Sequence, residues 1–255
     1  MSRVDLHVHS RLSKNFEFNR ESVGKLKDLG SRRGLSGFAL TEHIHAKNFW
    51  QMHEDLQDMY SYADGYYDVG DGFRIFSGAE ITVGERIDFI AVGPLDELRK
   101  LDETFTPKLS EWNFVPGLDF LDAARSRDLI VVSAHPFRPG KETAKLPLEE
   151  VFQRVDAVEV NGRDYGTEQK VADLGRAHSL ALAGSSDAHY YLQVGIRQTE
   201  IPYADLTLGN IKQALVDRQT RAHCKAYAPQ VVQLCKEIKT AAKLRKEEAA
   251  AVAVA

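Results

Sequence analysis

The stretch Val4-Asp5-Leu6-His7-Val8-His9-Ser10, close to the N-terminus, combines a strand pattern with two histidines. Its apolar residues alternate with polar ones, which is the pattern of a β-strand. Successive side chains of a strand point to opposite faces, so we expect Asp5, His7 and His9 to share one side. Two imidazoles with a carboxylate beside them can bind and orient around one divalent cation. A hydrogen-bonded histidine pair at a strand end is an equally good interpretation, so partners must be sought elsewhere.

Length and composition restrict the class of protein. The chain has 255 residues, of which 43% are hydrophobic and 27% charged, as in ordinary globular proteins. A net charge of -4 argues against a general nucleic-acid coat, which is normally basic. Cys224 and Cys235 are too few for a disulfide framework and favour a reducing compartment. The first strand leaves no room for a signal peptide, and no apolar run approaches the ~20 residues of a membrane helix. We therefore expect a cytoplasmic protein.

Strand and helix patterns alternate along the chain. Helical spacing is found at residues 20–33, 49–67 and 118–126, and apolar strand patterns at 36–41, 73–81, 87–92, 129–133, 155–160 and 180–183. The segment 87–92 follows closely enough to be the next strand or half of a hairpin, and residues 94–116 are charged and irregular and could form a surface excursion. This alternation predicts a parallel α/β fold in one domain, residues 1–228. Residues 229–255 are expected to form an amphipathic helix packed on it, with a frayed alanine-rich end.

Polar residues with metal-binding side chains recur just after these strands. In a barrel, reactive groups collect at the C-terminal rim, so the recurrence favours a barrel. Each residue alone could be a cap, a turn or a buried donor, but seven such residues near strand ends in one chain argue for one site. Imidazoles and carboxylates together suit Zn, Mn or Fe. The set exceeds what one tetrahedral ion can use, which favours two or three bridged ions, and comprises His7, His9, His43, Glu80, His135, Asp187 and His189.

These motifs resemble those of the PHP (polymerase and histidinol phosphatase) superfamily. Asp5-Leu6-His7-Val8-His9-Ser10 is similar to its first motif and Thr41-Glu42-His43 to its Thr-Asp-His motif. Gly78-Ala79-Glu80-Ile81 is similar to the third, and Ala134-His135-Pro136 and Gly184-Ser185-Ser186-Asp187-Ala188-His189 to the later ones. The motifs follow the family order over residues 4–189. The resemblance implies a distorted (β/α)7 TIM-like barrel with two or three divalent metal ions and phosphoesterase activity.

The resemblance also implies a ligand set. One metal would be held by His7, His9, Glu80 and Asp187, a second by Glu80 and His135, and a third by His43 and His189. Two positions differ from many family members. Lys14 and Asn15 stand where an Asp or His is common, and Asp88 stands where a histidine is common. Asp88 could still bind metal, whereas Lys14 could instead meet a substrate phosphate.

The function expected from this centre is hydrolysis of a small phosphomonoester, a phosphorylated metabolite or nucleotide. A hydroxide bridging the metals would attack phosphorus. Glu42 is expected to support a ligand more than to act as an acid, and His45 could be an acid, a ligand or a loop residue. Arg138 and Arg197 could bind phosphate or form surface ion pairs. The alternatives are a cyclic phosphodiesterase or exonuclease with the same centre, and a non-catalytic module stabilised by metals. No interleaved aromatic and basic residues indicate a nucleic-acid groove, and no membrane partner is expected.

Overall fold

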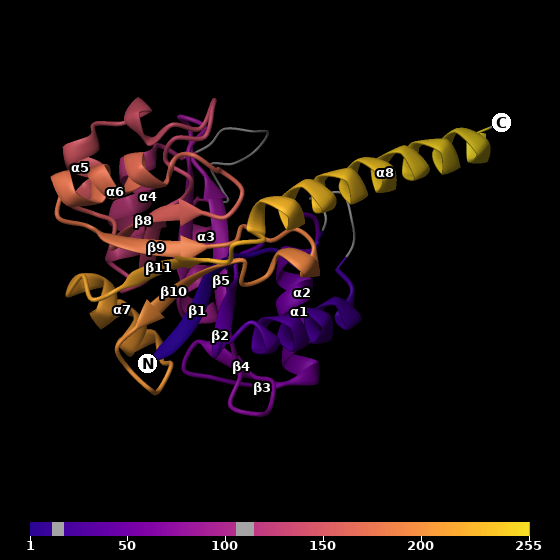
Figure 1. The fold of residues 1–255 in the computed structure, drawn as a ribbon, viewed down its shortest axis with the longest axis horizontal. Helices are drawn as coiled ribbons and strands as arrows, with labels where there is room; N and C mark the ends of the chain where they lie inside the picture. The colour runs from indigo at the N-terminus through magenta and orange to yellow at the C-terminus, as the bar shows by residue number, and fades with distance from the viewer. Residues whose placement is uncertain (12–17, 106–114, 255) are drawn as a thin grey trace.

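A mixed β-sheet that curls into a nearly closed barrel forms the body of the molecule (Figure 1). The computed structural model describes residues 1–11, 18–105 and 115–254, with side chains as far as residue 245. Seven strands form the wall of the barrel. In spatial order they are β1 (Ser2–Val8), β2 (Gly37–Leu40), β5 (Arg74–Thr82), β6 (Asp88–Val92), β7 (Ile130–Ser133), β8 (Ala157–Asn161) and β9 (Ala181–Ser185).

The barrel closes where the chain leaving β9 meets the end of β1. There His9 N donates a hydrogen bond to Ala188 O at 2.7 Å, and Val8 and Ala188 form a parallel bridge. Two further strands, β10 (Arg197–Ile201) and β11 (Arg221–Cys224), extend the sheet beyond β1. A short hairpin of β3 (Ser61–Ala63) and β4 (Tyr66–Asp68) pairs with β5. The predicted α/β barrel is thus confirmed.

The sheet is not wholly parallel, which differs from the expectation for the strand pattern. β5 and β6 form an antiparallel hairpin in which Thr82 pairs with Asp88, and β6 is also antiparallel to β7. A connection of five residues between the two strands is too short for a parallel crossover, so the chain must reverse. The reversal has a consequence for the site. Asp88, the first residue of β6, lies at the barrel end where the neighbouring parallel strands finish.

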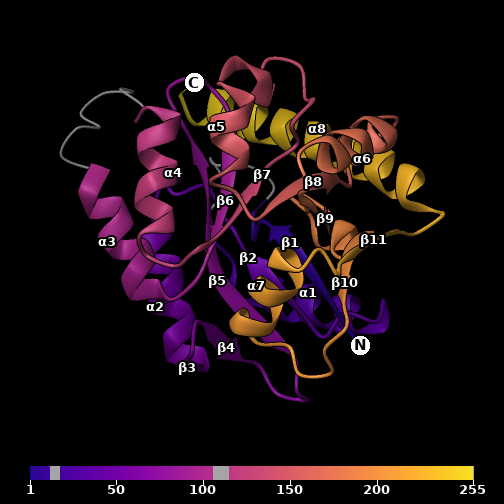
Figure 2. The same ribbon diagram turned by 90° about the vertical axis from the view of Figure 1, so that its left-hand side faces the viewer.

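Helices surround the barrel (Figure 2). The helices α2 to α4 lie along one side of the barrel, with α3 beside β5 and α4 beside β7. The N-terminus of α1 is capped by the Asn19 side chain, which accepts a hydrogen bond from Glu21 N at 2.8 Å. The helices are α1 (Arg20–Arg32), α2 (Phe49–Met59), α3 (Leu95–Phe105), α4 (Gly117–Arg125), α5 (Leu148–Phe152), α6 (Glu168–Ala177), α7 (Leu208–Val216) and α8 (Ala228–Val254), with 3-10 turns η2 (Thr143–Lys145) and η3 (Tyr191–Gln193).

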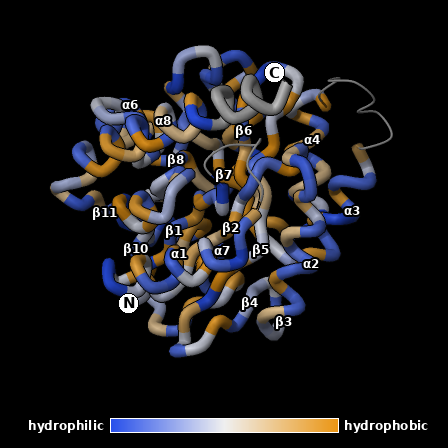
Figure 3. The backbone as a smooth tube through the Cα atoms, turned by 90° about the vertical axis from the view of Figure 1, so that its right-hand side faces the viewer, coloured by the Kyte–Doolittle hydropathy of each residue, from blue (hydrophilic) through white to orange (hydrophobic). Residues whose placement is uncertain are grey.

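Two apolar layers pack on opposite faces of the wall. The ladder register places Glu80 opposite Ile90 and Ile90 opposite Val132, so these three side chains share one face. That face carries an apolar cluster that also includes Ile211 and Leu215 of α7. The other face packs against the surrounding helices through larger residues such as Phe38 and Phe89. In Figure 3 many of the hydrophobic residues lie on the strands. Glu80 lies on the same face as Ile90 and Val132, at the polar end of that face.

Two segments differ from the expected elements. Helix α2 ends at Met59, and residues 61–68 form the β3–β4 hairpin instead of continuing the helix to residue 67. Asp64 and Gly65 have positive φ angles of 52° and 79°, which a helix does not allow and a tight hairpin turn requires. In the predicted irregular segment, residues 95–105 form α3, with Leu98 and Leu101 buried. Residues 106–114 lie outside the described part.

The long helix α8 starts at Ala228, close to the predicted position, and runs to Val254. Its N-terminal half lies against η3, while its C-terminal half extends away from the barrel (Figure 1). No helix in the described ranges combines the length and apolar composition needed to cross a membrane.

Candidate metal centre

The strand ends predicted to carry ligands converge at one end of the barrel. The side chains of His7 and His9 are buried and point their Nε2 atoms at each other across 3.1 Å. When Nδ1 of each ring is protonated, the Nε2 atoms carry free lone pairs. Two Nε2 atoms at this distance could therefore bind the same cation. Asp187 Oδ1 lies 3.8 Å from His7 Nε2 and 3.5 Å from His9 Nε2. The end of β1 and the end of β9 thus provide one group of three ligand atoms.

Glu80 lies between the other ligands, as expected for a bridging carboxylate. Its Oε2 is 2.8 Å from His43 Nδ1 and 3.5 Å from His9 Nε2, while its Oε1 is 3.2 Å from His135 Nε2. The loop after β2 continues to pair with β5 beyond the end of the strand, since Glu80 N donates to Glu42 O and Ile44 N donates to Glu80 O. This pairing brings His43 beside Glu80.

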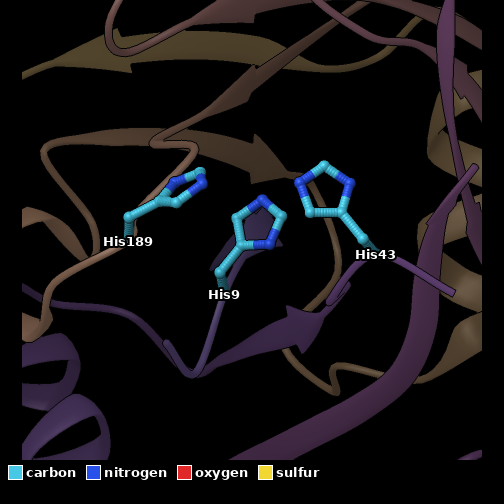
Figure 4. Close-up of side chains that lie close together, drawn as sticks. All are labelled: His9, His43 and His189. Atoms are coloured by element: carbon cyan, nitrogen blue, oxygen red, sulfur yellow. The ribbon is translucent and has the colours of Figure 1, made fainter. Parts of the chain in front are cut away.

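The ligand atoms fall into three groups that could each hold a cation. Within each group the atoms lie within 4.8 Å of one another. Figure 4 shows the side chains of His9, His43 and His189, with His9 in the middle. The ring centroids of His9 and His189 are 4.1 Å apart, and those of His9 and His43 are 5.0 Å apart. The groups are His7, His9 and Asp187; Glu80, Asp88 and His135; and His9, His43 and His189.

Asp88 takes part in this centre, although a histidine is common at its position in the family that the motifs resemble. Its Oδ2 lies 3.4 Å from His135 Nε2. The same carboxylate accepts hydrogen bonds from Thr82 Oγ1, at 2.6 Å, and from Lys141 Nζ. Lys141 neutralises this carboxylate, so a cation bound by Asp88 would compete with the ammonium group.

Two buried carboxylates support the histidines from behind. Glu159 Oε1 lies 2.8 Å from His7 Nδ1, and Glu42 Oε1 lies 3.3 Å from His9 Nδ1. A carboxylate on the far nitrogen fixes the ring orientation and leaves Nε2 as the metal-facing atom. For Glu42 this placement agrees with the expected supporting role. Burial opposes its charge, but the neighbouring His9 lowers the pKa of Glu42 to about 2, so it stays ionised.

Glu159 was missed by the sequence reasoning. It stands within the apolar run Ala157-Val158-Glu159-Val160, and the register with Ala183 of β9 puts it on the barrel-interior face. Its Oε2 also accepts hydrogen bonds from His135 N at 2.7 Å and Asn161 Nδ2 at 3.0 Å. A single acid inside a buried strand was the available signal, because a buried charge requires a partner.

Asp5 does not join the histidines, contrary to the expectation from strict strand alternation. The register between β1 and β2 shifts between Asp5 and Val8, and such an irregularity re-aims side chains. Asp5 instead accepts hydrogen bonds from Ser186 N at 2.9 Å and Gly195 N at 2.8 Å. It therefore anchors the segment that carries Asp187. Burial raises the pKa of Asp5 to about 6.

Two residues of the centre have strained backbones. His135 has a φ of 29° and Asp187 a φ of 52°, and each follows a wall strand. Side chains other than glycine rarely adopt these angles, which cost about 1–3 kcal/mol and are found mainly at functional sites. The surrounding hydrogen bonds, such as that from His135 N to Glu159, hold the strained geometry in place.

The electrostatics of the centre favour cations. Burial alone would raise the pKa of Glu80, but His43 and His135 hold it well below its ordinary value. In the same way, burial opposes the charge of Asp187, but Arg163, His7 and Arg138 keep its pKa low. Among the described residues, no Lys or Arg lies within ion-pair distance of Glu80 or Glu159. Buried carboxylates without basic partners are balanced in proteins by protonated imidazoles or metal ions.

Of the residues expected to bind substrate, Arg138 lies at the metal centre and Arg197 does not. Arg138 Nη2 donates to Asp187 Oδ2 at 2.7 Å, which puts it at the centre. Arg197 instead donates to Glu168 of α6 at 2.7 Å and so forms an ion pair. Lys14 and Asn15 lie outside the described residues. His45 is exposed and borders an apolar pocket with Ile44, Leu101 and Phe105, and it belongs to none of the described ligand groups.

Arg163 is a second basic residue at the centre, and the sequence reasoning did not select it. Its Nη1 donates to Asp187 Oδ1 at 3.1 Å and lies 3.2 Å from His189 Nδ1. Burial and the neighbouring His9 lower the pKa of His189 to about 3. A neutral His189 retains a free lone pair for a cation.

Solved structures with a similar fold include PHP-like proteins. No protein-family model and no curated protein sequence matches the chain. Among solved structures, the fold is similar to that of PsfC from Pseudomonas syringae PB-5123, with a TM-score of 0.76 and 26% identity over 94% of this chain and 99% of PsfC. It is also similar to the lesion-specific endonuclease PfuEndoQ from Pyrococcus furiosus, with a TM-score of 0.64 and 19% identity over 87% of this chain and 57% of the endonuclease.

A third similar structure is a two-domain protein from Bacteroides vulgatus that contains a predicted PHP-like metal-dependent phosphoesterase. The TM-score is 0.56, with 20% identity over 88% of this chain and 64% of that protein. This chain thus spans only part of the endonuclease and of the two-domain protein. The likeness defines a class: the chain has the barrel fold of PHP-like proteins. Its ordered motifs resemble those of the PHP superfamily, as expected from the sequence.

Proposed function

We propose that the chain is a metal-dependent phosphoesterase that hydrolyses a small phosphomonoester. The observation that carries the proposal is the convergence of nitrogen and oxygen ligands on Glu80, with His7 and His9 held from behind by Glu159 and Glu42. The donor set fits Zn, Mn or Fe, because imidazoles and carboxylates occur together. Bound divalent ions would supply a lowered water pKa and would withdraw charge from phosphoryl oxygens.

The residues of the chain would position the phosphate. Arg138 and Arg163 both hold Asp187, and each guanidinium keeps further N–H groups beyond these contacts. Planar guanidinium groups bind phosphate oxygens in pairs, so the two arginines would orient the ester at the centre. Glu159 and Glu42 would keep the His7 and His9 rings fixed while the phosphoryl group gains charge. Metal ligation is assigned to His7, His9, His43, Glu80, Asp88, His135, Asp187 and His189.

The proposal is tested by hydrolysis of a panel of phosphomonoesters, with bis(4-nitrophenyl) phosphate and a single-stranded oligonucleotide as diesters. The protein is assayed with Mn²⁺ or Zn²⁺, and the Glu80→Gln variant serves as the control for contaminating phosphatases. We expect turnover of monoesters by the wild type and a loss of at least 100-fold in Glu80→Gln. Preference for the diesters would overturn the monoester assignment. No turnover of any ester above the metal-only control would overturn the function itself.

A further inference from the structure

A cavity of about 370 Å³ lies beside the metal centre and is bordered on one side by α8. His189 belongs both to this cavity and to a ligand group, so the two are continuous. Its border also includes Arg138 and Arg163 on the barrel and Lys236 and Lys239 on the helix. Its size is that of a small-molecule pocket, since such pockets occupy roughly 300–1,000 Å³.

The cavity is strongly basic. Arg138, Arg163, Lys236 and Lys239 border it, against the single carboxylate of Asp164. The two arginines are already engaged: Arg138 donates to Asp164 and Asp187, and Arg163 donates to Asp187. The two lysines are not. Among the described residues, no carboxylate lies within ion-pair distance of Lys236 or Lys239, and Lys239 is half-buried.

Because neither Lys236 nor Lys239 has an acidic partner among the described residues, an anion bound in the cavity could pair with both. The phosphate under attack would be bound at the centre by the metal ligands and by Arg138 and Arg163. The lysines of α8 border the same cavity and would be left to bind another group. We propose that the substrate is a small molecule with two anionic groups. One is the phosphate that is hydrolysed, and Lys236 and Lys239 bind the other. The inference rests on the proposed phosphoesterase function and names its substrate class.

The position of α8 favours a small molecule over a polymer. The N-terminal half of the helix lies beside the barrel (Figure 1) and contacts η3, and Tyr190 and Gln193 also border the cavity. A nucleic-acid strand needs an open basic groove with stacking surfaces for its bases. A cavity closed on one side by a helix instead fits a metabolite with a carboxylate or a second phosphate.

The experiment compares matched ester pairs that differ in the second anion. Glycerol 3-phosphate is compared with 3-phosphoglycerate, which adds a carboxylate, and fructose 6-phosphate with fructose 1,6-bisphosphate, which adds a phosphate. We expect kcat/KM of the wild type to be at least tenfold higher for one or both substrates with two anions. In Lys236→Ala/Lys239→Ala that advantage should fall to less than threefold, mainly through KM, while the single-anion esters change less than threefold. Lys170→Ala, at an exposed position of α6, is the matched control.

Equal kcat/KM within both pairs would overturn the inference while leaving the phosphoesterase function intact. A loss in the double variant that is the same for all four esters would also overturn it, as would a loss confined to an oligonucleotide substrate. A second readout is independent of turnover. Calorimetric titration of the metal-depleted protein with 3-phosphoglycerate should give a Kd at least fivefold weaker in the double variant than in Lys170→Ala, and equal affinities would contradict the proposal.

Discussion

Glu159 determines how His7 can act, although it touches no ligand atom that faces the centre. Its carboxylate accepts from the far nitrogen of His7 and from the backbone N–H of His135, so one side chain positions two ligands on different strands. Histidine ligands depend on such partners, and their removal typically costs 10–100-fold in metal affinity.

We therefore predict that Glu159→Gln weakens metal binding by about 10–100-fold. The amide keeps the size of the side chain but lacks the negative charge that stabilises the His7 tautomer. Competitive titration with a chromophoric chelator measures the affinity. Glu103→Gln, at an exposed position of α3, should bind metal as the wild type does. Wild-type affinity in Glu159→Gln would show that His7 does not need this carboxylate.

His53 provides a prediction away from the centre. It is buried in α2, where its Nδ1 pairs with Tyr67 Oη at 2.9 Å. Burial, together with Arg99, lowers its pKa to about 3 from the ordinary 6.5. Between these values the unfolded chain binds the proton and the folded chain does not, so the folded state loses stability as pH falls.

The contribution of His53 should be complete above pH 6.5 and should decline below it by up to about 1.4 kcal/mol per pH unit. In His53→Gln the free energy of unfolding should therefore depend less steeply on pH between 6.5 and 4.5 than in the wild type. Urea denaturation at several pH values measures this difference. Parallel pH profiles of the two proteins would mean that the imidazole stays protonated in the fold.

At the level of elements, the backbones of β9 and β10 approach each other closely. Gly184 in β9 lies under β10, and a Cβ at this position would come within 2.4 Å of Gln198 O. Gly24 in α1 is a matched glycine without neighbours, because an added Cβ would meet nothing within 4 Å.

We predict that Gly184→Ala destabilises the protein by about 1–3 kcal/mol, since the two strands must separate to admit the methyl group. Gly24→Ala should instead stabilise it by about 0.5–1 kcal/mol, because alanine favours the helix. Thermal or urea unfolding measures both. Equal stability of the two variants would show that β9 and β10 do not approach as closely as described.

Most wall strands could be predicted from the sequence because each is a short apolar run followed by a polar residue. The antiparallel turn into β6 was left open, since periodicity does not record strand direction. The β3–β4 hairpin was missed although the sequence carries a signal for it, because Asp64-Gly65 between tyrosines is a preferred pair for a two-residue hairpin turn, and both residues have positive φ angles.

The site also contains residues that the sequence predicts and residues that it does not. Residues that follow strands, such as His135 and Asp187, were predicted because topology alone brings strand ends together. Glu159, Arg163 and Lys239 were not, because their roles depend on where their side chains meet other elements. Asp5 was misjudged because an irregularity in β1 breaks the alternation. For Arg197 phosphate binding and an ion pair were both left open, and the structure shows an ion pair with Glu168, on a helix that the sequence reasoning did not identify.

For the molecule as a whole, metal should be a source of stability. Glu80 and Glu159 are buried beside histidines, with no Lys or Arg partner in the described part of the chain, and a cation that binds only the folded state stabilises it by mass action. At 1,000 times Kd the gain is about 4 kcal/mol, which corresponds to about 8–16 °C in Tm for a chain of this size. Dialysis against EDTA should lower Tm by several degrees or more, and Mn²⁺ or Zn²⁺ should restore it. Glu80→Ala should respond less, whereas an unchanged Tm of the wild type would contradict this linkage.

Separate strand ends would together form one multinuclear metal site. Diffraction recorded at the absorption edge of the bound metal, on crystals grown with Mn²⁺ or Zn²⁺, tests it most directly. We predict at least two anomalous peaks: one among His7, His9 and Asp187, and one among Glu80, Asp88 and His135. Loaded crystals with no peak at these two positions would contradict the account.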